Sequence, residues 1–411
     1  MKFTSLVRNA MATGLSATLA LGLSACSRDY VAAYVYATNN NGSASTISAY
    51  AVDYQSGILT QISGSPFALN FTNPLLSIPS PNNRMLYTVS GSQDNKVEVW
   101  SIGTDGKLYA QATPSLTGTY PTGAAIDSTG TFLYVSYQRQ TTISPTASGP
   151  GGLTYFPVNN DGSLGTAVDV PVGAPSGTAP NIIPYPVGVT VTVPVSTNNN
   201  AVYVYVAEQL SPQANTTGAT SGVVMGYVRN ANGSLTSIGS YTAGVNPSAI
   251  ISDPTGRFVY VTDKTSNQVI GYEIMANGAL LPLVGSPYAT GLRPVAMTID
   301  PRGKYLYTVN YNSGNVSGFT IKHADGSLGS VVGTSAFTTA TGPTCVVVDP
   351  SVGDYLYTSN YLDGSISGAK LTPEDGTLKS LANSPFPAGT NTNCVTAVAN
   401  GSHADSIVYP Q

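Results

Sequence analysis

The chain has 411 residues, of which only 9% are charged, far below the quarter that is usual for soluble domains. The formal net charge is −4 and no run of basic residues occurs, which argues against nucleic acid as a partner. A weakly charged, Gly-, Ser-, Thr- and Asn-rich surface is expected instead.

The first 25 residues are predicted to be an export signal. Lys2 and Arg8 give a positive start, residues 10–23 are small and apolar, and the segment 23–26, Leu-Ser-Ala-Cys, resembles the lipobox of bacterial lipoproteins. The resemblance implies cleavage before Cys26, diacylation of this cysteine and, with Ser27 next, an outer-membrane or cell-surface location. An ordinary secretory signal is the alternative, and in both cases the mature chain leaves the cytoplasm.

Residues 247–287 show the repeating unit of the mature chain. Four short strands, called A to D here, are predicted at 247–253, 258–263, 268–274 and 280–285. The turn from Asp253 to Gly256 has the type I preference, and Asn277-Gly278 supplies the positive φ angles that a tight hairpin needs. One such sheet cannot bury both of its faces, so it requires neighbours.

Copies of this unit begin at Pro74, Pro121, Pro294 and Pro343. Glycines mark the turn between strands C and D in seven places: Gly57, Gly106, Gly162, Gly233, Gly278, Gly326 and Gly376. A period in the forties with four strands per repeat and no helical periodicity indicates a β-propeller.

The two ends of the chain are predicted to share the last blade. The first mature segment supplies strands B, C and D near Tyr34, Thr46 and Leu59, whereas the missing strand A begins at Cys394. This arrangement leaves no free sheet edge. We therefore predict an all-β, seven-bladed propeller with four antiparallel strands per blade, a single domain over residues 26–411, and a monomer.

Two sets of repeated polar residues permit two interpretations each. Four strands A end on an aspartate, and these carboxylates either cap their own turns, which is the favoured interpretation, or hold a cation at the channel. The aspartates are Asp127, Asp253, Asp300 and Asp349. Cys345 and Cys394 occupy the same position on adjacent inner strands and either form a disulfide or remain too far apart.

Three long insertions, 139–152, 173–185 and 209–222, emerge at one end of the predicted channel, in consecutive blades. The tight Asp-Gly and Asp-Pro turns belong to the other end. Long loops on a rigid scaffold usually carry binding sites, although disordered decoration would have a similar composition. We predict that the functional face is this loop-rich end over blades 2 and 3.

The repeat motifs resemble a known family. The segments YVTD at Tyr260, YTVN at Tyr307 and YTSN at Tyr357, the D-P-x-G turns, and the G-S-P-F or G-S-P-Y segments at Gly64 and Gly285 are similar to those of the seven-bladed lactonase propellers. That family includes the propeller-type 6-phosphogluconolactonases. The resemblance implies hydrolysis of a sugar-type lactone. The sequence contains no cofactor motif, so neither a cofactor nor a metal is predicted.

The resemblance also implies candidate catalytic residues. The family's Asn-Glu-Leu at the end of a strand B is echoed at Glu208, its Asn-Arg-Gly is approached by Lys264, and Arg293-Pro294 reverses its Pro-Arg. The family's histidines have no counterpart, because the two histidines of this chain, His323 and His403, lie elsewhere in the repeat.

Lactone hydrolysis needs a carboxylate that activates water and cations that stabilise the oxyanion, so Glu208, Lys264 and Arg293 are the predicted catalytic set. Arg139, Tyr185 and Asn310 are the predicted binding residues at the same end. The alternative is a non-catalytic, lipid-tethered propeller that binds a ligand or a protein with its insert-bearing face.

Overall fold

The structure is a computed structural model that describes residues 31–140, 150–178, 182–194, 201–212, 221–331 and 337–401. The predicted signal peptide, Cys26 and His403 lie outside the described residues, as do 141–149, 179–181 and 213–220 of the three insertions. No helix within the described part of the chain has the length and apolarity needed to span a bilayer.

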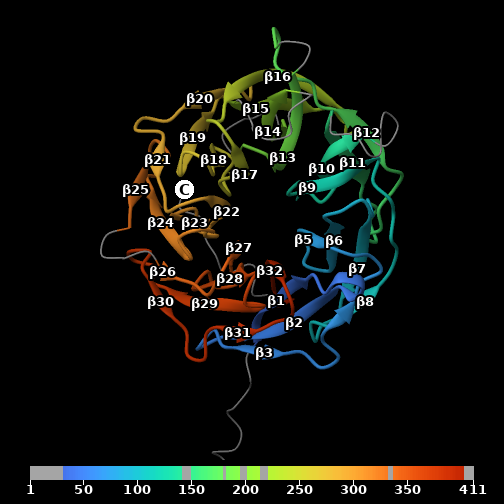
Figure 1. The fold of residues 1–411 in the computed structure, drawn as a ribbon, viewed down its shortest axis with the longest axis vertical. Coiled ribbons are helices and arrows are strands. Elements are labelled where there is room, and N and C mark those ends of the chain that lie inside the picture. The colour runs from blue at the N-terminus through green and yellow to red at the C-terminus, as the bar shows by residue number, and fades with distance from the viewer. Residues whose placement is uncertain are drawn as a thin grey trace, which may run out of the picture. The chain divides into compact units, whose positions relative to one another are not determined.

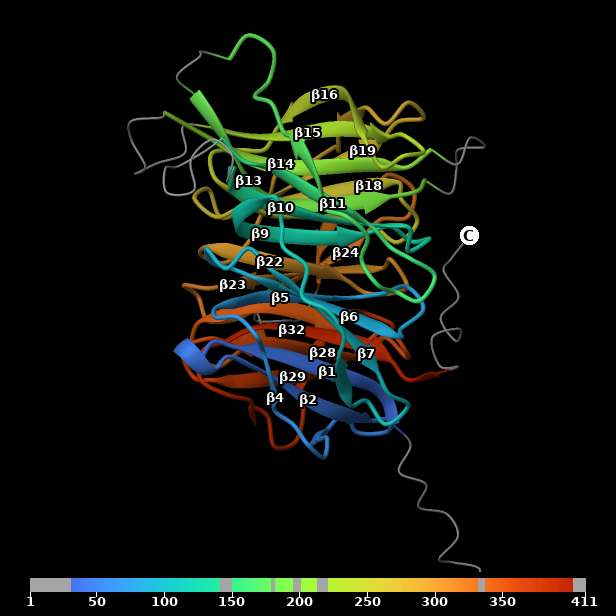
Figure 2. The same cartoon turned by 90° about the vertical axis from the view of Figure 1, so that its right-hand side faces the viewer.

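Seven antiparallel sheets lie around a central axis in the part of the chain that begins at Ala32, which confirms the predicted propeller (Figure 1). Figure 2 shows the strands from the side, as they run between the two ends of the ring.

Blade 1 contains β5 (Pro74–Pro79), β6 (Met85–Ser90), β7 (Val97–Ile102) and β8 (Leu108–Ala110). Blade 2 contains β9 (Gly118–Ile126), β10 (Phe132–Gln140), β11 (Gly152–Pro157) and β12 (Val168–Pro171). Blade 3 contains β13 (Ile182–Thr192), β14 (Tyr203–Pro212), β15 (Ser221–Arg229) and β16 (Leu235–Thr242).

Blades 4 to 6 repeat the same order and add a short fifth strand. Blade 4 contains β17 (Pro247–Ser252), β18 (Phe258–Asp263), β19 (Gln268–Ile274), β20 (Leu280–Pro282) and β21 (Tyr288–Ala289). Blade 5 contains β22 (Pro294–Ile299), β23 (Tyr305–Asn310), β24 (Asn315–Ile321), β25 (Leu328–Ser330) and β26 (Phe337–Thr338). Blade 6 contains β27 (Pro343–Val348), β28 (Tyr355–Asn360), β29 (Ser365–Leu371), β30 (Leu378–Ser380) and β31 (Phe386–Pro387).

Blade 7 joins the two ends of the chain, as predicted. It contains β1 (Val31–Asn39), β2 (Thr46–Asp53), β3 (Leu59–Gln61), β4 (Phe67–Ala68) and the inner strand β32 (Thr392–Ala399), with the short 3₁₀ helix η1 (Gly42–Ala44) between β1 and β2. β1 pairs antiparallel with β32, with Ala33 opposite Ala399 and Tyr36 opposite Thr396. The pairing closes the ring without a free inner edge.

The outermost strands are shorter than the sequence predicted. In blade 4 we expected strand D over 280–285, whereas β20 ends at Pro282. Gly285 has a positive φ of 81°, and the chain then returns as β21, which pairs with the beginning of β19. A turn therefore replaces the second half of the predicted strand.

Parts of the insertions are strands, where loops were expected. β10 continues to Gln140, and β13 and β14 remain paired out to Ile182 and Pro212. The hairpins of blades 2 and 3 therefore extend beyond the length of their counterparts in the other blades. The strands stay hydrogen-bonded because no tight turn ends them. We call these paired extensions the blade 2 arm, 118–121 with 137–140, and the blade 3 arm, 182–186 with 208–212.

A tyrosine in strand B of every blade donates a hydrogen bond to the next blade. Each hydroxyl reaches the carbonyl oxygen of the glycine in the neighbouring C–D turn at 2.7–2.8 Å. The pairs are Tyr36–Gly106, Tyr87–Gly162, Tyr134–Gly233, Tyr205–Gly278, Tyr260–Gly326, Tyr307–Gly376 and Tyr357–Gly57. Burial raises the pKa of all seven hydroxyls, so each stays protonated and donates.

Only glycine fits the acceptor position, for two reasons. All seven glycines have φ between +68° and +87°, a region that other residues rarely adopt. In addition, a Cβ at each would collide with the large side chain two residues before the tyrosine, such as Phe258 at Gly326 or Tyr203 at Gly278. The predicted turn glycines are therefore also the inter-blade contact points.

Alternate residues of a strand B pack against opposite neighbours. Val204 and Val206 of β14 join the apolar cluster shared with blade 2, whereas Tyr205 and Ala207 join the cluster shared with blade 4. Both faces of a strand B are thus buried, which explains why these strands are apolar throughout.

Cys345 and Cys394 form a disulfide in the structure, so the first of the two interpretations of this pair holds. Their Cα atoms are 4.9 Å apart, within the distance that a disulfide can span. The bond links β27 of blade 6 to β32 of blade 7. β32 is therefore tied to blade 6 by the disulfide and to the rest of blade 7 by its pairing with β1.

We expect Tyr260→Phe to lower the free energy of unfolding by about 1–3 kcal/mol, because the buried carbonyl of Gly326 loses its donor. Chemical denaturation measures the change. Tyr288→Phe is the matched control, since its hydroxyl also donates to a carbonyl, that of Val284, but at an exposed position, and about 0.5 kcal/mol or less is expected. Equal losses in the two variants would contradict a special role for the buried bond.

We expect the double variant Cys345→Ser, Cys394→Ser to lose about 2–4 kcal/mol of stability. The disulfide joins residues that are 49 positions apart and so lowers the conformational entropy of the unfolded chain. Denaturation with and without a reductant measures this loss. The variant should be insensitive to the reductant, and unchanged stability of the reduced wild type would show that the bond contributes nothing to ring closure.

Candidate functional site

One position in each strand B identifies the exceptional blade. The residue three places after the tyrosine that bonds to the next blade pairs with a residue of the inner strand at a bulge, and we call it the bulge residue. Its partner is a proline in blades 1 to 6 and Thr392 in blade 7. The seven bulge residues are Asn39, Ser90, Tyr137, Glu208, Asp263, Asn310 and Asn360. They lie toward the loop-rich end, where the B–C and D–A connections meet.

In six blades the bulge side chain makes hydrogen bonds inside its blade. The Asn310 amide donates to Asn315 Oδ1 and Ser317 Oγ, both at 2.8 Å. Asp263 accepts the backbone N–H groups of Val245, Asn246, Thr265 and Ser266. Asn39, Ser90, Tyr137 and Asn360 make related contacts. The position normally ties a connection of the loop-rich end to the sheet.

Glu208 is the exception. Its side chain is fully buried, and neither carboxyl oxygen has a hydrogen-bond partner among the described residues. It shares the face of β14 on which Val204 and Val206 pack, the face toward blade 2. Burial raises the pKa of Glu208 well above its ordinary value. In blades 1, 4, 5, 6 and 7 this position bonds to the B–C turn or to strand C, whereas in blade 3 the strand β14 continues to Pro212.

Lys264 and Arg293 lie beside each other on blades 4 and 5. Arg293 N donates to Asn267 Oδ1 at 2.7 Å, and Asn267 belongs to the same turn as Lys264. Arg293 has a φ of 56°, and its guanidinium lies 5.0 Å from the centroid of the Tyr311 ring. The pKa of Lys264 is lowered, first by burial and then by the Arg293 charge, while Asp263 opposes this change.

The structure therefore brings two members of the predicted catalytic set together. Lys264 and Arg293 interact electrostatically, whereas burial is the cause of the raised pKa of Glu208. One side-chain hydrogen bond joins blade 3 to blade 4 near these residues, because Gln209 Nε2 donates to the backbone carbonyl of Pro247 at 3.0 Å. Glu208 itself faces blade 2, on the opposite side of β14.

The predicted binding residues have different environments. The Arg139 guanidinium lies 4.2 Å from the centroid of the Tyr120 ring on the blade 2 arm. Tyr185 is half-buried and pairs with Gln209 on the blade 3 arm. Asn310 is fully buried, and its amide donates to Asn315 and Ser317 of β24.

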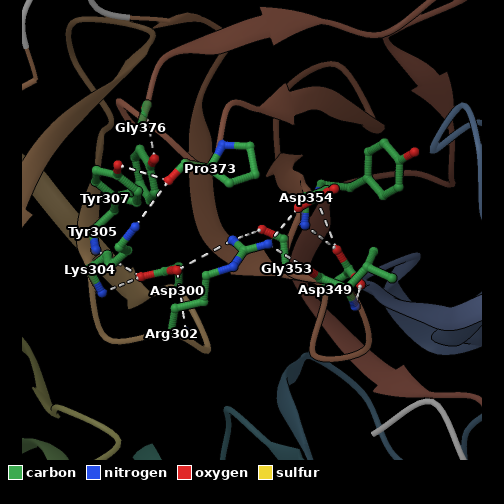
Figure 3. A network of polar contacts seen from close by, with 12 residues as sticks. Asp300, Arg302, Lys304, Tyr305, Tyr307, Asp349, Gly353, Asp354, Pro373 and Gly376 are labelled. Carbon is green, nitrogen blue, oxygen red and sulfur yellow. Dashed lines mark hydrogen bonds and ion pairs between the residues drawn. The ribbon is translucent and has the colours of Figure 1, made fainter. Parts of the chain in front are cut away.

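The aspartates that end the inner strands cap their turns, in accord with the favoured interpretation. Asp300 accepts the N–H groups of Lys304 and Tyr305 at 2.7 Å each, as Figure 3 shows. In the same view Arg302 extends to Asp354 and to the carbonyl of Gly353. Over the described residues, no group of three or more His, Cys, Asp or Glu side chains could hold a metal ion.

A cavity of about 220 Å³ lies on the central axis and is lined by all seven inner strands. Thr122, Ser248 and Thr344 border it, and each hydroxyl donates to a carbonyl of the next blade. No charged side chain lines this cavity. A second cavity, of about 570 Å³, lies at the turn end beside Arg84 and Asp161. The charged candidate residues thus belong to neither cavity.

Sequence reasoning missed Asn246, Asn267 and Tyr311. Asn267 orients Arg293, Tyr311 supports its guanidinium, and Asn246 Oδ1 is buried without a hydrogen-bond partner in the described structure. Asn246 and Arg293 both precede the first proline of an inner strand, so aligning the repeats by this proline could have found the position.

We expect Glu208→Gln to stabilise the protein increasingly as the pH rises above about 4.3, the ordinary Glu value. The folded protein keeps a proton there that the unfolded chain has lost, so wild-type stability falls from that pH up through the raised pKa. Melting temperatures from pH 4 to 8 measure the difference, with the exposed Glu273→Gln as the control. A difference that does not change with pH would contradict the buried, unpartnered carboxyl.

Comparison with known proteins agrees with this fold. A family model described as "Lactonase, 7-bladed beta-propeller" matches residues 30–182 and 197–348. The comparison with curated proteins found no match. A protein of Bacteroides fragilis, provisionally named a 6-phosphogluconolactonase, is 18% identical with a TM-score of 0.70, covering 90% of this chain and 99% of its own. The periplasmic gluconolactonase of Pseudomonas aeruginosa is 19% identical with a TM-score of 0.66, at the same coverage. The chain belongs to the lactonase family of seven-bladed β-propellers.

Proposed function

We propose that the protein is a lactone hydrolase of the cell envelope that opens a sugar-type lactone and is anchored by a lipid on Cys26. Membership of the lactonase family supports the reaction class. The likeness to a protein named as a periplasmic gluconolactonase supports an uncharged sugar lactone outside the cytoplasm. The lipobox-like segment before Cys26 supports the same compartment.

The observation that carries the proposal is the unpartnered carboxyl of Glu208. A buried carboxyl is costly, and such groups concentrate at functional sites. In lactone hydrolysis, water attacks the carbonyl carbon while a base takes its proton, and negative charge develops on the carbonyl oxygen. Glu208 is the proposed base, and Lys264 and Arg293 are the proposed stabilisers of the oxyanion.

The raised pKa of Glu208 sets the pH dependence of this mechanism. A base acts only when it is deprotonated, so kcat/KM should rise with pH through an apparent pKa well above 4.3. At low pH the carboxyl holds a proton and the reaction stops.

We expect Glu208→Gln to lower kcat/KM about 100-fold or more on δ-lactones of sugars, because the amide cannot accept the proton. Stopped-flow measurement of acid release with purified mature protein gives the rate. Glu98→Gln is the control, since Glu98 is equally buried but its oxygens accept hydrogen bonds from Asn70. Equal turnover in wild type and Glu208→Gln would reject Glu208 as the base.

A second function has one observation in its favour. The Glu208 side chain faces blade 2, whereas Lys264 and Arg293 lie on blades 4 and 5, so the three residues form two separate groups. Hydrolysis requires the base and the cations to act on the same ester group, so two separate groups favour binding. The protein would then bind a ligand or a protein with the arms of blades 2 and 3. Saturable binding of a lactone without any acid release would support this function over hydrolysis.

A further inference from the structure

Backbone contacts hold Lys264 and Arg293 in place at the loop-rich end. Lys264 N donates to the carbonyl of Asn246 at 3.0 Å, and Tyr311 N donates to the carbonyl of Arg293 at 2.9 Å. Asn267 accepts the N–H of Arg293, and the guanidinium packs on Tyr311. The fold therefore holds the backbones of two basic residues in neighbouring turns, and their charges interact.

These two charges lack an acidic partner. Neither side chain takes part in an ion pair within the described residues. Asp263 is the nearby acid, but its oxygens already accept four backbone N–H groups and the Ser266 hydroxyl. Adjacent like charges raise the energy of the unliganded site, and an anion bound between them would remove that repulsion.

Asn246, whose backbone contacts Lys264, carries a hydrogen-bond acceptor that is unsatisfied within the described part of the chain. Asn246 Oδ1 is buried and has no partner among the described residues, and its backbone carbonyl is bonded to Lys264. An unsatisfied buried acceptor is costly and gains energy from a donor on a ligand. Two cations and one acceptor together complement a carboxylate whose neighbouring carbon carries a hydroxyl.

We propose that Lys264, Arg293 and Asn246 bind the 2-hydroxy carboxylate of an open-chain sugar acid, the product of the lactone hydrolysis. Lys264 and Arg293 contact the carboxylate, and the hydroxyl donates to Asn246 Oδ1. The identification of the anion as the product rests on the proposed function. In that reaction water adds to the carbonyl carbon, the ring C–O bond breaks and the ring oxygen takes a proton. The acid then releases a proton to solvent and leaves a carboxylate, so the product gains a negative charge that the lactone lacked.

This assignment predicts inhibition by product. The lactone is uncharged, whereas the product carboxylate is negatively charged. The carboxylate therefore forms charge-assisted hydrogen bonds with both cations, and these are roughly twice as strong as neutral ones. Accumulated product therefore occupies the site, and raised ionic strength weakens its binding because the exposed Arg293 charge is screened.

Calorimetric titration of the full protein with D-gluconate and with D-glucitol tests the proposal without any turnover. The two molecules have the same carbon chain and differ in the carboxylate. We expect gluconate to bind at least about tenfold tighter, and Lys264→Met and Arg293→Met each to weaken it about tenfold or more. Lys379→Met, an exposed lysine on an outer strand, is the matched control and should change nothing.

Equal affinities for gluconate and glucitol, or full gluconate affinity in both Met variants, would overturn the proposal. So would binding of inorganic phosphate alone, without gluconate. Salt dependence in the wild type provides a test that needs no variant, and salt-independent gluconate binding would also count against it. Gluconate binding that is lost in the variants, combined with no acid release from any lactone, would keep the anion site and reject the proposed hydrolysis.

Discussion

The hydrogen bond from a buried tyrosine to the glycine of the next blade is the contact on which the ring depends. It occurs seven times, always from strand B to the following C–D turn, and the last copy joins Tyr357 to Gly57 and so closes the circle. Each bond fixes one blade against the next at the turn end. The B–C and D–A connections at the opposite end are therefore free to vary without disturbing the ring.

The repetition distinguishes structural polar groups from exceptional ones. A buried asparagine or aspartate at the bulge position is ordinary here, because Asn310, Asn360 and Asp263 all bond to their own blade. Glu208 occupies the same position without a partner among the described residues, and Lys264 and Arg293 place two cations where other blades have neutral residues. All three departures lie on consecutive blades at one end. Departures from a repeat that cost stability are expected where function resides.

The fold could be predicted from the sequence because its determinants are local. A glycine at each C–D turn and a tyrosine in each strand B recur at a fixed spacing, and the strand missing from the first mature segment is found near the other end of the chain. The environment of the candidate site depends on register and pairing across the fold. The sequence does not show that the Asn310 amide donates to two residues of β24, or that Glu208 is the bulge residue without a partner among the described residues. The proximity of Lys264 and Arg293 arises through Asn267, a contact that no sequence motif announces.

The central claim is that blade 3 buries a carboxyl for which the described structure provides no partner, while the same position is satisfied in the other six blades. Carbon-13 NMR of protein labelled at the glutamate carboxyl carbons tests it most directly, with Glu208→Gln to assign the resonance. The account predicts one glutamate signal, absent in the variant, that titrates well above 4.3. If the Glu208 resonance titrates at the ordinary value, its carboxyl is solvated or paired, and the claim is wrong.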